Sequence, residues 1–416
     1  MSRVLLFGLL LLLLVAESAC GESLDARALR CENINSRVER CFGKGAPLFD
    51  CKRVSDADLD AADTLTDSAA CELAGEVPFD GDPRSASCRL YGVDCVSPIQ
   101  SAPEHGGAAF PVVLVNGIDT SPLFRWSTRI QDVLRAQGSR VFLATLGPYQ
   151  PPVKRAPELA KKIDAVLAET GADKVNLVCH SLGGLDCRYY ASPNGLAADR
   201  GLPVDAFAQK VASITTVGTA HRGTRAAEAA LGMLASIEAD DAANALASVL
   251  GDWFSAERLG EDADIRASFV ALTPSNMKAF NEDVPDAEGV YYQSFAGFSR
   301  PDGGSTPAHD AKIQEACATE YGDGLELFVA HDRLALALAP LFPIVGSGET
   351  DIEAVLPNDG LVTIASTKWG TFRGCVPADH MEQLGQYKLP NVNVRTGVDI
   401  AWFYASIVTD LAGRGF

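Results

Sequence analysis

From residue 110 onward, short runs of apolar residues alternate with longer stretches in which apolar residues recur at helical spacing. Uninterrupted apolar runs are typical of strands buried on both faces of a sheet. Strands separated by helices of this length predict βαβ units and a mostly parallel sheet. We expect strands at 110–116, 140–146, 175–178, 211–217 and 290–298, and helices at 123–137, 158–170, 185–191, 226–250, 332–342 and 398–412.

The first twenty residues have a different pattern. Arg3 precedes an apolar run over residues 4–15, and small residues follow up to Cys20. The run is too short to span a bilayer comfortably, so residues 1–20 predict a cleaved export signal. The sequence before Cys20 partly fits a lipoprotein cleavage site, which would make this cysteine a lipid anchor, although Glu17 stands where leucine is usual.

Residues 21–105 form a polar segment that contains six of the eleven cysteines. It holds too little apolar sequence for an independent core, so disulfides would supply much of its stability. Disulfides persist outside the cytosol, which favours a secreted or periplasmic protein. The net charge of −19 argues against nucleic acid as a partner. We expect residues 106–416 to form the second domain.

The candidate chemistry is concentrated at residues 173–187, where a buried strand, a turn of small residues and a helix follow each other. Ser181 lies in the turn, which is the context of a nucleophile elbow. A serine in so tight a turn needs small neighbours two residues away. Gly183 meets that demand, and Cys179 stands where glycine is usual.

A serine hydroxyl needs a histidine to accept its proton and an acid to orient that histidine. In the α/β-hydrolase fold the order along the chain is nucleophile, acid, histidine. Asp359 lies in an Asn-Asp-Gly turn and His380 follows it, so we assign these two residues as partners of Ser181. The alternative uses His331 as the base.

In that alternative Asp302 or Asp310 would orient the histidine.

The oxyanion that forms during acyl transfer needs two backbone N–H donors. We expect these donors to be the amides of Ile118, in the loop after the first strand, and Leu182, directly after the serine.

Taken together, these stretches resemble the triacylglycerol lipases of Pseudomonas and Burkholderia. The likeness covers residues 110 to 390 and includes VVLVNGI at 112–118, KVNLVCHSLGG at 174–184, NDGLV at 358–362 and DHME at 379–382. Asn116 stands where the family has histidine. The resemblance implies an α/β-hydrolase fold with a mostly parallel central sheet, helices on both faces and a helical lid within 225–270. Whether the helix at 226–250 is that lid or simply covers the sheet stays open.

The resemblance also implies a structural calcium near the catalytic histidine, with carboxylates from Asp332 and Glu382, where the family has aspartate in place of Glu382. No organic cofactor is expected, and a dedicated foldase is a possible partner. The family's disulfide does not carry over, because its second cysteine would fall near Ala365. A bridge between Cys317 and Cys375 is one alternative pairing. Cys179 and Cys187 form either a bridge or two buried thiols.

We therefore expect an exported serine carboxylic-ester hydrolase that forms an acyl-enzyme on Ser181, with acylglycerols as the substrates that the resemblance implies. Two alternatives remain. The first is another esterase of this fold, such as a polyester depolymerase. The second is a surface binding or adhesion protein on an inactive hydrolase scaffold, with the cysteine-rich segment as the binding part.

Overall fold

A computed structural model describes Cys31 and residues 107–120, 124–235, 263–319, 332–335, 338–346, 354–385 and 398–416. Residues 1–20, almost all of the cysteine-rich segment and the central part of the expected lid lie outside these ranges. Cys31 is buried and disulfide-bonded. No helix within the described ranges is both long and apolar enough to cross a membrane.

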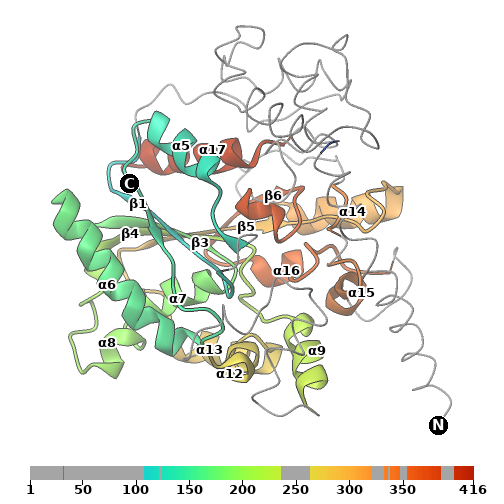
Figure 1. Ribbon diagram of the computed structural model, residues 1–416, viewed down its shortest axis with the longest axis horizontal. Helices are drawn as coiled ribbons and strands as arrows, with labels where there is room; N and C mark the ends of the chain where they lie inside the picture. The colour runs from blue at the N-terminus through green and yellow to red at the C-terminus, as the bar shows by residue number, and fades with distance from the viewer. Residues whose placement is uncertain are drawn as a thin grey trace, which may run out of the picture. The chain divides into compact units, whose positions relative to one another are not determined.

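The described residues contain one sheet of six strands in the order β2-β1-β3-β4-β5-β6 (Figure 1). All pairings between neighbours are parallel, which confirms the predicted sheet type. The central strand β3 ends at the serine turn. The strands are β1 Val112–Val115, β2 Val141–Ala144, β3 Val175–His180, β4 Val211–Val217, β5 Tyr291–Gly297 and β6 Thr371–Val376.

Helices cover both faces of the sheet, as predicted (Figure 1). Within the described residues, short 3₁₀ segments occur at Ala208–Lys210 and Glu382–Leu384. The helices are α5 Thr128–Ala136, α6 Pro152–Thr170, α7 Leu182–Ala191, α8 Leu196–Asp199, α9 Arg225–Leu234, α12 Ile265–Ala271, α13 Pro274–Asp283, α14 Pro307–Cys317, α15 Leu341–Gly346, α16 Ile364–Thr367 and α17 Ile400–Gly413.

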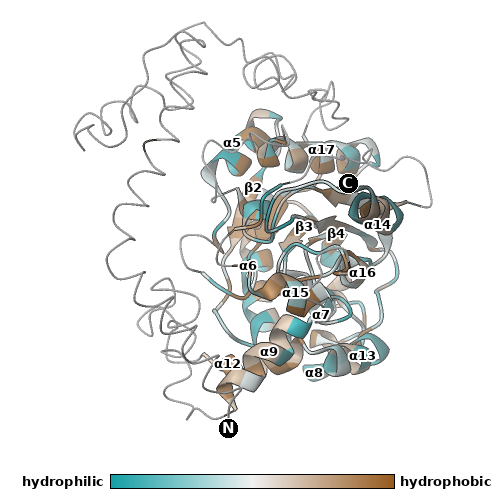
Figure 2. Cartoon of the chain, turned by 90° about the vertical axis from the view of Figure 1, so that its right-hand side faces the viewer, coloured by the Kyte–Doolittle hydropathy of each residue, from teal (hydrophilic) through white to brown (hydrophobic). Residues whose placement is uncertain are grey.

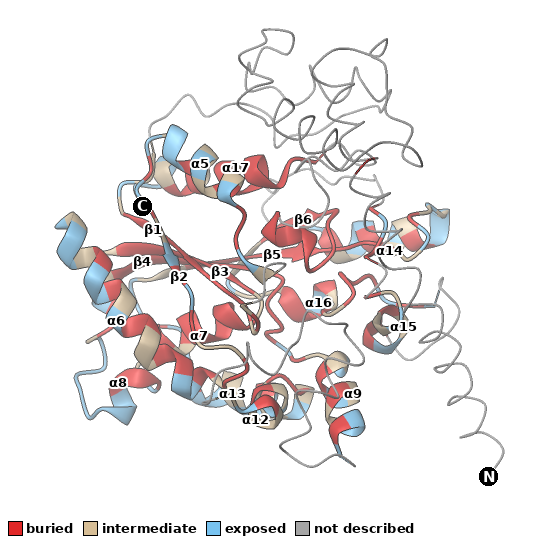
Figure 3. Ribbon diagram, viewed as in Figure 1, coloured by how far each residue is buried: buried red, intermediate tan, exposed pale blue. Residues whose placement is uncertain are grey.

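The alternation of side chains along a strand divides the core between the two faces. Val112 and Leu114 pack with residues of α5 and α17, whereas Val113 and Val115 pack with residues of α6, α7 and α8. All four side chains are fully buried, and β1, β3 and β4 are buried along their length (Figure 3). Full burial of one such side chain contributes about 1.5–3 kcal/mol. The continuous apolar runs are therefore explained by burial from both sides.

Two sequence predictions differ from the structure in this region. Helix α6 begins at Pro152, not at residue 158, and contains Pro157. The predicted helix over 332–342 is wrong, because the described residues around Arg333 are extended and Arg333 forms a parallel bridge with Arg300. The helix here is α15, and it begins nine residues later than predicted, at Leu341.

Helices α9, α12 and α15 lie side by side (Figures 1 and 2). Helix α9 confirms the start of the predicted alanine-rich helix and ends at Leu234, and residues 236–262 lie outside the described part. The lid assignment therefore stays a prediction. A disulfide between Cys317 and Cys375 joins the end of α14 to β6, which is the pairing that the sequence offered as an alternative.

Candidate active site

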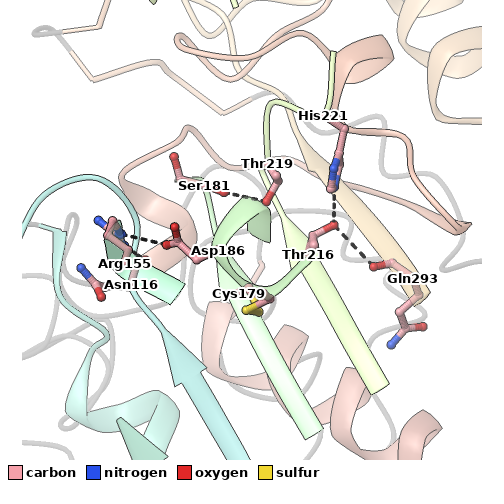
Figure 4. Close-up of a disulfide and its surroundings, with 10 residues drawn as sticks. Asn116, Arg155, Cys179, Ser181, Asp186, Thr216, Thr219, His221 and Gln293 are labelled. Carbon is pink, nitrogen blue, oxygen red and sulfur yellow. Dashed lines mark hydrogen bonds and ion pairs between the residues drawn. A yellow bond between two sulfur atoms is a disulfide. The ribbon is translucent and has the colours of Figure 1, made fainter. Parts of the chain in front are cut away.

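Ser181 occupies the turn between β3 and α7 in a strained backbone conformation. Its φ is 54° and its ψ is −128°. Tyr149 is the other described non-glycine residue with positive φ. Such geometry costs on the order of 1–3 kcal/mol and persists only where surrounding contacts impose it. Here the Ser181 amide donates to the Val217 carbonyl of β4, and the Ser181 carbonyl accepts from the Thr219 hydroxyl at 2.8 Å (Figure 4).

The glycines after the serine are required by close backbone approach. A Cβ on Gly183 would lie 2.5 Å from the Asn116 carbonyl oxygen, and a Cβ on Gly184 would lie 2.2 Å from the Thr219 hydroxyl. Helix α7 can therefore pack against β4 and the loop after β1 only with glycine at both positions. A Cβ on Gly117 would lie 3.0 Å from the Ser181 Cβ, so that loop lies directly beside the serine.

Cys179, two residues before the serine, forms a disulfide with Cys187 of α7 (Figure 4). Both residues are fully buried. The sequence left a bridge and two thiols as alternatives, and the structure has the bridge. It closes an eight-residue separation around Ser181 and so links the strand before the serine to the helix after it.

The structure brings Ser181, His380 and Asp359 together. The Nε2 atom of His380 lies 2.8 Å from the Ser181 Oγ, and its Nδ1 lies 2.8 Å from Asp359 Oδ2. The serine and histidine are 199 residues apart in the chain. Both the acid and the imidazole are buried. The chain thus contains a continuous serine–imidazole–carboxylate relay at the carboxyl ends of the strands.

Asp359 is held as a pure hydrogen-bond acceptor. Its Oδ1 accepts from the amides of Leu361 at 3.0 Å and Val362 at 2.7 Å, and its Oδ2 accepts from the Gln383 amide at 2.9 Å. With the carboxylate as acceptor, His380 must donate through Nδ1. Its Nε2 is then left to accept the serine proton.

The turn that presents Asp359 is the one predicted from Asn-Asp-Gly. The Asn358 side chain accepts from the Gly360 amide at 2.9 Å, and Gly360 has φ 92°, which an L side chain rarely adopts. The His380 amide donates to the Asp359 carbonyl at 3.0 Å. The acid turn and the histidine loop are therefore joined by backbone as well as by side chains.

His180, which precedes the serine, lies against His380 with ring centroids 4.7 Å apart. Burial lowers the pKa of His180 well below its usual value, and the nearby His380 lowers it further. His180 consequently stays neutral at physiological pH. A neutral neighbour does not repel the positive charge that His380 acquires when it accepts a proton.

The loop after β1, which contains Ile118, is fixed by buried polar groups. Asn116, at the position where the resembled family has histidine, accepts from the Leu146 amide at 2.7 Å and donates to the Gly117 carbonyl at 3.0 Å. Arg155 of α6 donates to the Asn116 carbonyl at 2.9 Å and pairs with Asp186 of α7 at 2.8 Å (Figure 4). Sequence reasoning missed Arg155 and Asp186, because these residues lie on different helices, 31 positions apart in the chain, and meet only in the folded protein.

Near the histidine, Asp332, Asp379 and Glu382 are buried with carboxylate oxygens within 4.8 Å of one another. Asp332 and Glu382 are the two carboxylates expected to bind calcium, and the structure places them together. Asp379 is an addition that the sequence analysis did not assign, although it directly precedes His380. Its carboxylate accepts from the amides of Ala335, Met381 and Glu382, so it also orders the histidine loop.

The alternative triad has His331 as its base, and this residue lies outside the described ranges. Asp302 forms an ion pair with Arg300 at 3.0 Å, and Asp310 accepts from the Ser305 hydroxyl at 2.6 Å. The alternative triad therefore stays a prediction.

Comparisons with known proteins point in the same direction as the motifs. No family model matches the chain. The chain is 31% identical over 197 residues to a triacylglycerol lipase from Burkholderia plantarii, which covers 45% of this chain and 51% of that protein. It is 29% identical over 208 residues to a triacylglycerol lipase from Vibrio cholerae, covering 45% of this chain and 62% of that protein. The chain spans about half the length of the first curated relatives it matches.

Among solved structures, a lipase from Staphylococcus hyicus aligns over 76% of this chain and 99% of its own, with 17% identity and a TM-score of 0.47. A metagenomic carboxyl esterase aligns over 76% of this chain and 79% of its own, with 15% identity and a TM-score of 0.49. The parallel sheet, its helical layers and the serine turn at the end of a central strand are those of the α/β-hydrolase fold. The curated relatives confirm the resemblance to bacterial triacylglycerol lipases that the motifs indicate.

Proposed function

We propose that this chain is a serine hydrolase that cleaves carboxylic esters, with triacylglycerols as its substrates. The observation that carries the proposal is the relay of two 2.8 Å contacts from Ser181 Oγ through His380 to Asp359. A buried, acceptor-only acid behind the imidazole fixes the tautomer that a general base needs. The strained serine turn adds support, because such strain is concentrated at functional sites.

The proposed reaction proceeds in two halves. The Ser181 oxygen attacks the ester carbonyl carbon while His380 Nε2 takes the hydroxyl proton, and the tetrahedral oxyanion accepts from the amides of Ile118 and Leu182. His380 then gives the proton to the leaving alcohol as the carbon–oxygen bond breaks. Water attacks the acyl-enzyme in the second half, with His380 as base, and releases the carboxylic acid and the serine hydroxyl.

An apolar cluster beside the serine supports an acyl substrate. It contains Leu182 and Leu185 of α7 and Val362 next to the acid turn, with Ile118 and Leu361 partly exposed against it. Leu182, Leu185 and Val362 are buried in the core, so Ile118 and Leu361 are the members of this set that could present apolar surface to an acyl chain. The names of the curated relatives point to triacylglycerols within this class.

We further propose that Asp332, Asp379 and Glu382 hold a structural calcium ion. The set consists only of carboxylate oxygens, which calcium prefers, and it is buried and close-spaced. A bound cation would balance these neighbouring negative charges. The three residues would then tie the segment at 332–335 to the loop that presents His380. Because EDTA would remove this ion, we expect EDTA to lower the melting temperature of the wild-type chain and to leave that of an Asp332→Asn variant unchanged.

We also propose that the protein is exported from the cytosol. The two described disulfides at Cys179–Cys187 and Cys317–Cys375 are typical of proteins outside the cytosol. Cleavage of residues 1–20, lipidation of Cys20 and dependence on a foldase remain predictions from the sequence, since they concern residues or partners outside the described structure.

Hydrolysis of short and long p-nitrophenyl esters and of emulsified triacylglycerol tests the function. Wild type is compared with Ser181→Ala and with Ser275→Ala, an exposed serine outside the site. We expect Ser181→Ala alone to abolish turnover of all three substrates. Activity confined to short esters would favour an esterase, and activity on polyester films without lipase activity would favour a depolymerase. Absence of any Ser181-dependent turnover would favour the binding protein.

A further inference from the structure

We propose that Gln383 is a positioning residue that acts through Asp359, holding the carboxylate toward His380 without adding charge. The inference rests on the proposed function and adds a fourth side chain to the relay. Sequence reasoning did not assign Gln383 any role. Three observations carry the proposal: its contact with the acid, the way its own backbone is held, and the space the fold reserves for it.

The contact is direct and shared with the histidine. Gln383 Nε2 donates to Asp359 Oδ2 at 2.9 Å, and His380 Nδ1 lies 2.8 Å from the same oxygen. The other carboxylate oxygen is held by backbone amides of the acid's own turn. Among the described residues, only the side chains of His380 and Gln383 form hydrogen bonds with Oδ2 of Asp359. Its donation fixes the angle at which this oxygen meets the imidazole.

Gln383 is itself held in place by other elements. Its amide donates to the Asp379 carbonyl at 3.1 Å, and its carbonyl accepts from the hydroxyl of Tyr404 on α17 at 2.9 Å. Gln383 and Tyr404 are fully buried. A side chain with a fixed backbone and no solvent contact loses little further entropy when it makes its hydrogen bond.

Two glycines leave room for this side chain. A Cβ on Gly218, directly after β4, would lie 2.3 Å from Gln383 Oε1. A Cβ on Gly297, the last residue of β5, would lie 2.0 Å from Gln383 Nε2. Any larger residue at either strand end would displace the Gln383 amide from Asp359. The carboxyl ends of two strands therefore accommodate the glutamine as they do the triad.

An amide suits this position on physical grounds. A carboxylate there would face Asp359 with like charge, and a cation would compete with the imidazolium for the acid. A neutral N–H donor orders the carboxylate and leaves the charge balance between Asp359 and His380 unchanged. Loss of the donor should therefore impair the proton transfer steps and spare substrate binding.

The test uses Gln383→Met, which keeps the length of the side chain and removes the donor. The matched control is Gln293→Met on β5, another buried glutamine, whose side-chain amide donates to the Thr215 hydroxyl of β4 at 2.8 Å and, within the described part of the chain, is not hydrogen-bonded to Asp359. For Gln383→Met we expect kcat to fall about 10-fold with KM within twofold of wild type, since the Asp359 carboxylate loses a charge-assisted hydrogen bond that orders it toward His380. Gln293→Met should leave both constants within twofold.

Two further readouts separate positioning from general destabilisation. In an Asp359→Asn background, Gln383→Met should change kcat less than twofold, because its partner is already altered. The low-field proton resonance of His380 Nδ1–H should move in Gln383→Met and stay in place in Gln293→Met. If the Met variant does not fold, Gln383→Leu takes its place.

The inference is overturned if Gln383→Met matches its control in kcat and in the resonance, or if the full loss of kcat persists in the Asp359→Asn background. If wild type has no Ser181-dependent turnover, the proposed function fails. In that case the chemical shift of the His380 Nδ1–H proton still tests the role of Gln383, because it reports the contact with Asp359 whether or not the chain hydrolyses esters.

Discussion

The buried ion pair between Arg155 and Asp186 offers the sharpest prediction on how the serine site is held together. Both side chains are fully buried, and the guanidinium also donates to the carbonyls of Gly147 at 3.1 Å and Asn116 at 2.9 Å. Arg155→Met removes all of these donors and leaves the Asp186 carboxylate alone in the core. Removing one partner of a buried pair costs about 3–5 kcal/mol. We expect an unfolding free energy, from urea melts, lower by this amount.

The pH dependence of that loss can be worked out. Burial raises the pKa of Asp186 from 3.8 to about 6, with Arg155 opposing the rise. The pKa of Asp186 is thus higher in the folded chain than in the unfolded chain. Its protonated form therefore stabilises the fold fully below pH 3.8, and this stabilisation is lost as the pH rises through about 6. Without Arg155 the pKa rises further, so the deficit of Arg155→Met should be largest at neutral pH and shrink below about pH 4.

A second substitution separates stability from activity. Arg155→Met with Asp186→Leu removes the stranded charge, and apolar replacement of a buried pair is often neutral. The double variant should regain most of its stability, yet stay at least about 10-fold low in kcat, because the loop that carries the proposed oxyanion donor Ile118 has lost its hydrogen bond to Arg155. Arg135→Met, which removes the exposed pair with Asp132 and one donation to the Val141 carbonyl, should change stability by less than about 1.5 kcal/mol. If Arg155→Met unfolds at pH 7 with the same free energy as wild type, the ion pair does not hold these elements together.

Three further outcomes follow from the structure. Gly183→Ala should abolish activity, because its Cβ would meet the Asn116 backbone, whereas Gly232→Ala, with open space at the Cβ in α9, should be as active and up to about 1 kcal/mol more stable. Replacing Cys317 and Cys375 by alanine should lower the unfolding free energy from urea melts by about 4 kcal/mol, because their bridge closes a long loop. Replacing Cys179 and Cys187, whose loop is shorter, should lower it by about 2.5 kcal/mol, and a reversed order would contradict this. Burial, and next Arg188, lower the pKa of His221, so stability should fall as pH drops below about 6.5, and His221→Gln should flatten that decline.

The sequence specified the central elements well, since burial on both faces leaves a clear pattern. The strand predicted at 211–217 has the observed bounds, and the serine turn, the acid turn and the histidine were all located from local motifs. Strand β6 at the sheet edge escaped prediction, because Arg373 and Gly374 interrupt its apolar residues. The prediction at 332–342 failed since backbone pairing with Arg300, a distant residue, overrode local helical spacing.

The supporting residues of the site were harder to predict for the same reason. Arg155 reads as an ordinary charged residue on an amphipathic helix, and nothing local indicates its partner on α7. Asp379 and Gln383 lie beside His380 in the chain, which was a signal of proximity but not of role. Their hydrogen bonds to the acid and to loop amides depend on how α17 and the strand ends pack.

Covalent labelling followed by mass spectrometry shows whether Ser181 is the nucleophile. The mature chain is treated with a long-chain alkyl p-nitrophenyl phosphonate, an analogue of the acylation transition state, and its peptides are mapped. We predict one adduct on Ser181, absent in Ser181→Ala and formed far more slowly in His380→Ala. Failure to label, or labelling that persists when Ser181 is replaced, would contradict the account.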